Sequence, residues 1–339
     1  MKKYYAVLPV LLSICLLTVP QVGAASRSGH ISMEFDLSSH AKDEEARLWI
    51  PYPVSDGNQE ISEIRLSGDY AEAAVYTDRV FGTPMLFARW DEGAKSRRLN
   101  LSFAVERQEV LRRDFPAKES AWDPADYAVY LAPTTLGPVD GRVKKLADSI
   151  TSGQTTVLGK SRAIYDWIVE NMYRDPDTRG CGSGDVCVLL EKPGGKCADI
   201  SSVYVALARA AGVPAREIFG IRQGKEPVQD ISGWQHCWAE FFLPGYGWVP
   251  VDPADVRKMM LTQKLKLDDA KTAECREYFW GGIDPYRIKL GEGRDLILNP
   301  PQRGGPVNYL MYPFAQIGGK TLDWLDPAAF KYTITYRAN

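Results

Sequence analysis

The chain has 339 residues, of which 45% are hydrophobic and 25% are charged. This length exceeds that of one average domain and the composition allows a substantial core, so we expect two domains. The net charge of −2, without a long run of like charges, argues against nucleic acid as a partner.

Residues 1–24 have the features of a secretory signal peptide: lysines near the start, an apolar middle and small residues at the end. Cys15 follows Ile14 rather than a small residue, which argues against lipoprotein cleavage at that cysteine. No other segment reaches the ~20 apolar residues of a membrane span. We expect a mature protein that starts near Ala25, is periplasmic or secreted and has no stable membrane insertion, although an uncleaved anchor would have similar sequence features.

Residues 25–110 alternate apolar and polar side chains between Gly, Asp and Asn turns, which is typical of half-buried strands. The strand-like segments are 31–37, 47–52, 86–90 and 99–105. They predict a small antiparallel domain that resembles a β-sandwich. We find no catalytic cluster in this domain.

Residues 111–138 are rich in Pro, Asp, Ala and aromatic residues, which indicates an irregular connector. We expect residues 139–339 to form the second domain, with C-terminal β elements. Helical spacing predicts helices at 139–150, 157–172, 197–211 and 268–280. Alternation predicts strands at 215–221, 234–243, 248–251 and 331–337, and a hairpin made of 286–290 and 295–298.

Export would leave five cysteines in an oxidising compartment, and an odd number leaves at least one thiol outside any disulfides. Cys181 and Cys187 flank a short glycine-rich loop that could close as a disulfide hairpin. Cys237 and Cys275 would then be the second pair, and Cys197 would remain free. The sequence does not fix this connectivity, so other pairings stay open.

Cys197 is placed where a turn becomes a helix. Gly194 and Gly195 supply the turn, and apolar residues recur at helical spacing after Cys197. The free N–H groups and the positive dipole at a helix N-terminus favour a thiolate, so Cys197 is a candidate nucleophile. The alternative is a cysteine used as a small core residue.

His236 lies in a predicted strand that begins after Gly233. Alternation places His236 on one face with Trp234 and Trp238, and Cys237 on the other face. A zinc site built from adjacent His and Cys is therefore disfavoured, and the spacing of Cys181 and Cys187 is wider than that of a usual structural zinc pair. We expect no metal.

Asp252 ends the next predicted strand, which follows a Pro-Gly-Tyr-Gly turn. The two strands would form an antiparallel hairpin that brings Asp252 beside His236. A carboxylate there would orient the imidazole and stabilise its charged form. Cys197, His236 and Asp252 would then be a nucleophile, a base and an orienting group. The alternative for Asp252 is an Asp-Pro pair that starts a turn.

Four blocks of the sequence, in order and at suitable separations, closely resemble the transglutaminase-like superfamily. They are Gly-Gly-Lys-Cys197-Ala-Asp-Ile-Ser, Ala-Leu-Ala-Arg209-Ala-Ala-Gly-Val-Pro-Ala-Arg216, His236-Cys-Trp-Ala-Glu and Gly-Trp-Val-Pro-Val-Asp252-Pro. The resemblance covers residues 161–253. It implies an α+β, papain-like core in which a helix carrying the cysteine packs on an antiparallel sheet. It also implies Cys197 as nucleophile, His236 as base and Asp252 as its orienting group.

The expected function is that of an exported thiol enzyme acting on amide bonds of a protein or peptide through a thioester, with peptidase or amidase activity favoured over cross-linking. The Cys197 backbone N–H is one oxyanion donor, and we cannot assign the second. Trp234 and Trp238 either line the substrate cleft or pack in the core. We expect no cofactor. The alternative is a non-catalytic module that binds a peptide or cell-wall polymer on the same fold.

Overall fold

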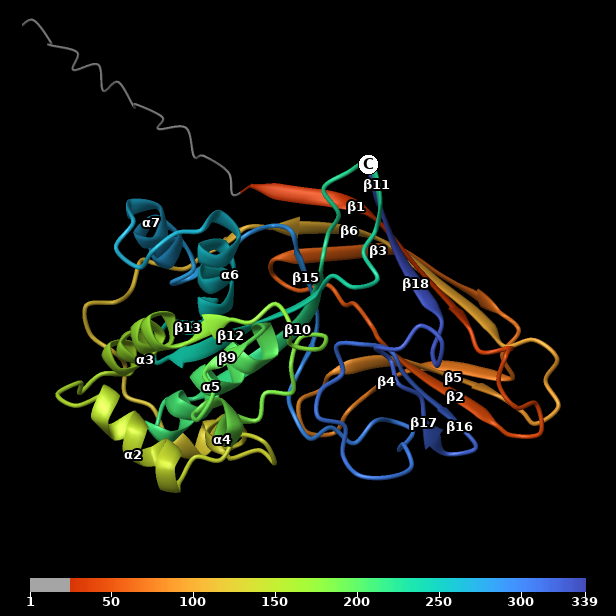
Figure 1. Cartoon of the computed structure of the whole chain (residues 1–339), viewed down its shortest axis with the longest axis horizontal. Helices are drawn as coiled ribbons and strands as arrows, with labels where there is room; N and C mark the ends of the chain where they lie inside the picture. Colours follow the sequence, from red (N-terminus) through yellow and green to blue (C-terminus); the bar gives the residue numbers. More distant parts are fainter. Residues whose placement is uncertain (1–24) are drawn as a thin grey trace, which may run out of the picture.

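The computed structural model describes residues 25–339, so the predicted signal peptide and Cys15 lie outside the described residues. The molecule is elongated, with a lobe containing the helices at one end and a β-sandwich at the other (Figure 1). Within the described residues, no helix combines the length and the apolar character needed to cross a membrane.

The β-sandwich consists of two five-stranded antiparallel sheets. The first sheet has the order β11 (Val228–Asp230), β18 (Tyr332–Ala338), β1 (Ser26–Asp36), β6 (Arg98–Gln108) and β3 (Gln59–Gly68). The second has the order β17 (Lys320–Thr321), β16 (Phe314–Ile317), β2 (Ala46–Pro51), β5 (Pro84–Trp90) and β4 (Glu72–Thr77).

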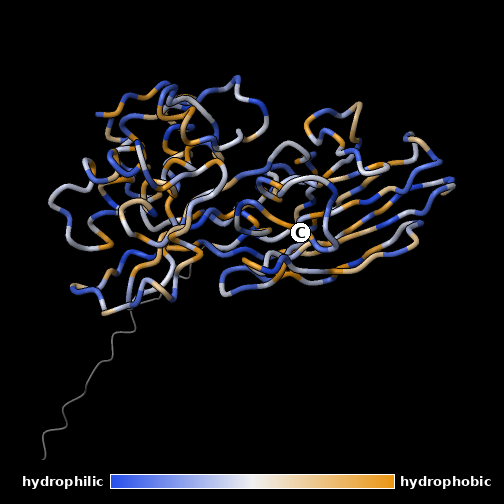
Figure 2. The backbone as a smooth tube through the Cα atoms, turned by 90° about the horizontal axis from the view of Figure 1, so that it is seen from below, coloured by the Kyte–Doolittle hydropathy of each residue, from blue (hydrophilic) through white to orange (hydrophobic). Residues whose placement is uncertain are grey.

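Alternation along the strands builds the core of the sandwich, and Figure 2 shows apolar and polar positions succeeding each other along them. Ile31 and Met33 of β1 pair with Phe103 and Leu101 of β6, and all four are buried. They pack against residues of the second sheet such as Leu48 in one apolar cluster. The predicted N-terminal β domain is therefore present.

The C-terminal strands complete this sandwich. β18 pairs with β1 along seven residues, and β16 pairs with β2. We predicted one domain for residues 139–339, but residues 314–338 belong structurally to the N-terminal sandwich. Alternation of apolar and polar residues indicates which face of a strand is buried, but it does not indicate which strand pairs with it. The pairing of segments so far apart in the chain could therefore not be predicted from it.

The other lobe has a four-stranded antiparallel sheet of order β13 (Gly247–Val251), β12 (Gln235–Leu243), β10 (Ala215–Arg222) and β15 (Arg287–Glu292). Helix α5 (Cys197–Ala210) packs on this sheet, and α2 (Gly141–Ile150) and α3 (Val157–Asn171) cover α5 from outside (Figure 1). Every residue of α5 is buried. This is the predicted α+β core, with the cysteine helix at its centre.

Short elements connect these parts. They are β7 (Val110–Leu111), the 3-10 helix η1 (Pro124–Tyr127), α1 (Ala128–Leu131), β8 (Tyr173–Arg174), α4 (Val186–Leu189), β9 (Gly194–Gly195), α6 (Pro253–Gln263), α7 (Ala270–Tyr278) and β14 (Gly282–Ile283). β8 and β9 pair in parallel, whereas the pairs in the two sandwich sheets and the four-stranded sheet are antiparallel.

One helix was not predicted, and one local prediction was wrong. α6 begins at Pro253 with Asp252 as its N-cap, since proline suits the first helical position. The predicted hairpin of 286–290 and 295–298 does not form, because β15 pairs with β10 instead and Leu296 makes a single bridge to Val307.

A glycine-rich loop is held against the start of α5 by the buried carboxylate of Asp199. Asp199 accepts hydrogen bonds from the backbone N–H groups of Gly184, at 2.9 Å, and Lys196, at 3.0 Å. Gly182 adopts a left-handed backbone with φ of 93°, and a methyl group there would overlap the Asp199 carboxylate. This loop carries Cys181, so Asp199 places Cys181 beside the first turn of α5.

We predict that Gly182→Ala destabilises the protein more than Gly153→Ala does. Both glycines have positive φ, but no atom lies within 4 Å of a methyl group at Gly153. The control should cost about 1–2 kcal/mol for the left-handed backbone, and Gly182→Ala about 1–3 kcal/mol more for the overlap with Asp199. Urea unfolding measures both, and equal losses would contradict this role of the glycine loop.

Candidate active site

Cys197 is the first residue of α5, as predicted. Its side chain is 2% exposed. The next backbone N–H, that of Ala198, donates to the carbonyl of Cys181 at 2.9 Å. Within residues 25–339 the backbone N–H of Cys197 has no acceptor, so it is free to donate to a bound group.

The surroundings of Cys197 hold its thiol pKa well below the usual range. Hydrogen bonds from the thiols of Cys181 and Cys237 are the largest causes, and the hydrogen bond and charge of His236 add to them against the opposing effect of burial. The pKa values of Cys181 and Cys237 are raised well above the usual range by burial and by the same hydrogen bonds. Two protonated thiols therefore face one sulfur that favours the thiolate.

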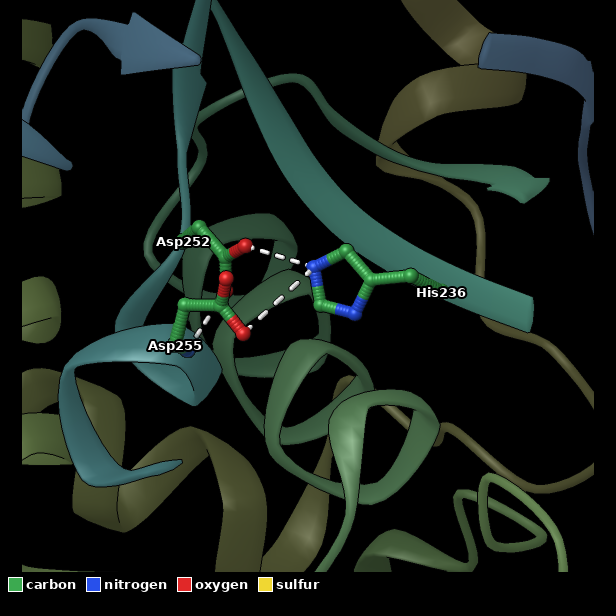
Figure 3. Close-up of side chains that lie close together, drawn as sticks. All are labelled: His236, Asp252 and Asp255. Atoms are coloured by element: carbon green, nitrogen blue, oxygen red, sulfur yellow. Dashed lines mark hydrogen bonds and ion pairs between the residues drawn. The ribbon is translucent and has the colours of Figure 1, made fainter. Parts of the chain in front are cut away.

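His236 lies on β12 and is almost fully buried. Its Nε2 is 2.7 Å from Oδ2 of Asp252 and 3.9 Å from Oδ1 of Asp255 (Figure 3). Because Asp252 is ionic and accepts at Nε2, the tautomer with a proton on Nε2 is favoured, and Nδ1 is the nitrogen left for the Cys197 thiol.

Asp252 lies directly after β13 and is completely buried. The predicted hairpin of β12 and β13 forms and brings Asp252 to His236. Its Oδ1 also accepts the backbone N–H of Asp255 at 2.9 Å, which caps α6. The same carboxylate therefore orients the imidazole and fixes the start of a helix.

Arg287 on β15 neutralises the buried carboxylates behind His236. Its guanidinium pairs with Asp252, with Asp255 at 2.6 Å and with Asp284 at 3.0 Å, and it is completely buried. Arg222 pairs with Asp255 at 2.6 Å. Burial alone would raise the pKa of Asp255, but the charges of Arg222 and Arg287 hold it well below the usual range.

The sequence did not point to Arg222, Asp255 or Arg287. Arg287 is 35 residues from Asp252 and lies in a segment that we predicted as part of a separate hairpin. The available signal was an arginine at the start of an apolar strand, which is also compatible with an exposed strand end.

His236, Asp252 and Asp255 could offer ligand atoms to a metal, since these atoms lie within 4.8 Å of one another. The charges around them disfavour this. The two aspartates already neutralise the guanidinium groups of Arg222 and Arg287, and a divalent cation would meet both positive charges at close range. The donor set therefore does not fit a metal site.

The predicted disulfides are not formed, and all five described cysteines are free thiols. Cys181 is buried, where its sulfur accepts from the Tyr312 hydroxyl at 3.2 Å, whereas Cys187 is exposed on α4. Cys237 faces Cys197, and Cys275 is half-buried on α7, where burial and nearby carboxylates raise its pKa to about 12. The two cysteines of each predicted disulfide therefore lie in different environments. The length of the loop between two cysteines does not indicate this difference.

A cavity of about 630 Å³ adjoins the site, and we call it the main cleft. Its wall includes the two residues that precede Cys197 and His236, namely Lys196 and Gln235, together with Cys181 and Trp234. Of the two alternatives for the tryptophans, Trp234 lies on the wall of this cleft. Trp238 packs in the core, in a small cluster with Val110, Ile218 and Ile283.

Comparison with known proteins gives matches over the same region. Residues 144–253 match the family model of the transglutaminase-like superfamily, and this range contains Cys197, His236 and Asp252. An uncharacterized protein of Haemophilus influenzae is 38% identical over 314 residues, which covers 85% of each chain. The relationship to that protein therefore extends over both lobes.

Two further matches are more distant. The protein-glutamine gamma-glutamyltransferase of Pseudomonas aeruginosa is 25% identical over 172 residues, which is 46% of this chain but only 25% of that enzyme. The crystal structure of a candidate cysteine protease from Cytophaga hutchinsonii covers 93% of this chain and 99% of its own, with a TM-score of 0.55 and 16% identity. That likeness shows the shared fold.

The motif blocks, the cysteine helix on its antiparallel sheet, the matched family model and the H. influenzae relative all agree. The chain belongs to the transglutaminase-like superfamily.

Proposed function

We propose that the protein is an exported thiol enzyme that hydrolyses an amide bond of a protein or peptide. The observation that carries this proposal is the chain of contacts from the low-pKa thiol of Cys197 to His236 and on to Asp252. A nucleophile, a base and an orienting carboxylate are the groups that acyl transfer requires. A module that only binds a ligand needs none of these contacts.

In the first half of the reaction, the thiol proton moves to Nδ1 of His236 and the sulfur of Cys197 attacks the amide carbonyl carbon. A C–S bond forms, and the carbonyl oxygen gains negative charge that the backbone N–H of Cys197 stabilises. The C–N bond then breaks, and the departing nitrogen takes the proton from His236. The products of this half are an amine, or ammonia, and a thioester on Cys197.

In the second half, His236 accepts a proton from water while the water oxygen attacks the thioester carbonyl. A C–O bond forms, the C–S bond breaks and the proton returns to the sulfur of Cys197. An amine in place of water would give a new amide by the same steps. We favour water as the acceptor, in line with the description of the C. hutchinsonii protein as a candidate protease. The match to the glutamyltransferase covers only 25% of that enzyme and gives little support to an amine acceptor.

Export is part of the proposal and is supported by the composition of residues 1–24. Expression of the full chain, followed by fractionation and intact-mass measurement, tests it. The expected result is a protein outside the cytoplasm whose mass corresponds to a start near Ala25.

We predict that Cys197 alkylates with iodoacetamide far faster than Cys181, and that His236→Ala reduces this difference. Both sulfurs are buried, but their pKa values are shifted in opposite directions. A lowered pKa keeps the thiolate present above that pKa and lost only below it, so the Cys197 rate should stay high at pH values where a free thiol with a pKa of ~8.5 reacts slowly. Mass spectrometry after timed labelling gives each rate.

The ultraviolet absorbance of the thiolate, taken as the difference between wild type and Cys197→Ser, provides a control that needs no reagent access. If this signal titrates as a free thiol does, the enzymatic proposal fails. The alternative function, a non-catalytic module that binds a ligand on the same fold, would then be favoured.

We predict that Asp252→Asn raises the Cys197 pKa by roughly one unit or more, because the imidazolium loses its ionic partner. Asp255→Asn is the matched comparison. It removes an equal charge at 3.9 Å from Nε2 without breaking the 2.7 Å contact, so the Cys197 pKa should rise less than in Asp252→Asn. The thiolate absorbance titration measures both variants. Shifts of the same size would show that Asp252 acts only as a general negative charge.

We predict that a chelator leaves the labelling rate of Cys197 unchanged, since Arg222 and Arg287 occupy the positions of positive charge beside the aspartates. The measurement is alkylation before and after exhaustive dialysis against the chelator. A rate that fell on chelation and returned with one particular metal would overturn the assignment of these aspartates to ion pairs.

A further inference from the structure

The main cleft continues into a second hollow of about 510 Å³. The two share a boundary formed by Arg222, Lys225, Trp234 and Lys258. Together they make a groove that passes Trp234. Gln235, the residue before His236, lines the main cleft, whereas Asp255 and Asp284 line the second hollow. A groove of this kind can hold an extended chain with one of its amide bonds near Cys197.

The charge of the main cleft differs from that of the whole chain. Five cationic residues and no acidic residue line it, namely Arg174, Lys196, Arg222, Lys225 and Lys258. Arg222 pairs with Asp255, but no carboxylate among residues 25–339 lies within 4.0 Å of the other four. In a chain with a net charge of −2, this concentration of unpaired positive charge requires an explanation.

Lys258 shows the electrostatic situation most clearly. It lies on α6 and is half-buried. Burial lowers its pKa, and the positive charges of Arg222 and Arg174 lower it further against the opposing effect of Asp255. A partly desolvated ammonium group without a paired carboxylate is costly, and an anion placed in the cleft would remove that cost.

Gln235 supplies an independent observation. Its side chain is 7% exposed and lines the main cleft, yet neither its amide nitrogen nor its amide oxygen has a hydrogen-bond partner within residues 25–339. Buried amides in folded proteins are nearly always paired. A peptide backbone has one acceptor, the C=O group, and one donor, the N–H group, for each residue. The amide nitrogen and amide oxygen of Gln235 can pair with these two groups.

Aromatic side chains form the other wall of the main cleft. Trp234 directly precedes β12, whereas Phe330 and Tyr332 come from the C-terminal segment that completes the sandwich. The cleft therefore lies where the two lobes meet. The aromatic wall can pack against the apolar parts of an extended peptide while the opposite cations meet its charges.

From these contacts we propose that the substrate is an acidic peptide, whose carboxylates bind the unpaired cations of the main cleft while Gln235 pairs with its backbone. This inference rests on the proposed function for the location of the scissile bond. Its recognition elements are Lys225, Lys258 and the amide of Gln235.

The test measures binding of two fluorophore-labelled peptides to the full mature chain carrying Cys197→Ser, which cannot form a thioester. One peptide alternates Glu and Ala, and the other alternates Gln and Ala. We expect the acidic peptide to bind roughly tenfold more tightly or better, with an advantage that shrinks as salt rises. Fluorescence anisotropy gives both dissociation constants.

Variants assign the preference to the cleft. Lys258→Gln and Lys225→Gln should each reduce the acidic preference several-fold, whereas Lys320→Gln, an exposed lysine on β17 of the sandwich, should leave it unchanged. Lys225 is exposed, so its variant keeps the test meaningful if Lys258→Gln fails to fold. Gln235→Leu should weaken both peptides alike, because it removes a contact to the backbone.

Equal affinity for the two peptides, or a preference lost equally in Lys320→Gln, would overturn the inference. Failure here can be separated from failure of the proposed function. If Cys197 labels fast but the acidic peptide does not bind more tightly, the proposed enzymatic function stands and the acidic-peptide substrate is rejected. If the acidic peptide binds more tightly but Cys197 is not reactive, the protein recognises acidic peptides as a binding module without catalysis.

Discussion

The buried carboxylate of Asp252 holds the candidate site together. Its Oδ2 meets His236 and Arg287, and its Oδ1 caps α6, so one side chain ties β12, β15 and α6 to the end of β13. A completely buried charge is tolerated only when it is paired and hydrogen-bonded on all sides. The contacts that stabilise the buried charge of Asp252 therefore also orient the imidazole of His236.

A second constraint acts on the nucleophile from the opposite side. Asp199 draws the glycine-rich loop onto the start of α5, which brings the thiol of Cys181 to Cys197, while β12 brings Cys237 from the sheet. Protonated thiols, an imidazole and a helix N-terminus then surround one sulfur, and each favours negative charge on it. The low pKa of Cys197 thus depends on the loop and the sheet as much as on the helix.

The two lobes cooperate in the cleft beside this site. The lobe with the helices contributes the cations, and the C-terminal segment that closes the sandwich contributes Phe330 and Tyr332. The relationship to the H. influenzae protein likewise extends over 85% of the chain and is not confined to the cysteine helix and its sheet. The sandwich is part of the wall that a substrate would meet.

The sequence by itself determined the α+β core, the cysteine helix, the β12–β13 hairpin and the proximity of His236 to Asp252, because helical period, strand alternation and a short turn are local and the motif blocks are specific. Only the tertiary structure decided which cysteines lie together, that Trp238 is buried, that Arg287 neutralises Asp252, and that β18 joins β1. These facts depend on contacts between segments far apart in the chain, and local periodicity records the burial of a side chain but not the identity of its neighbour.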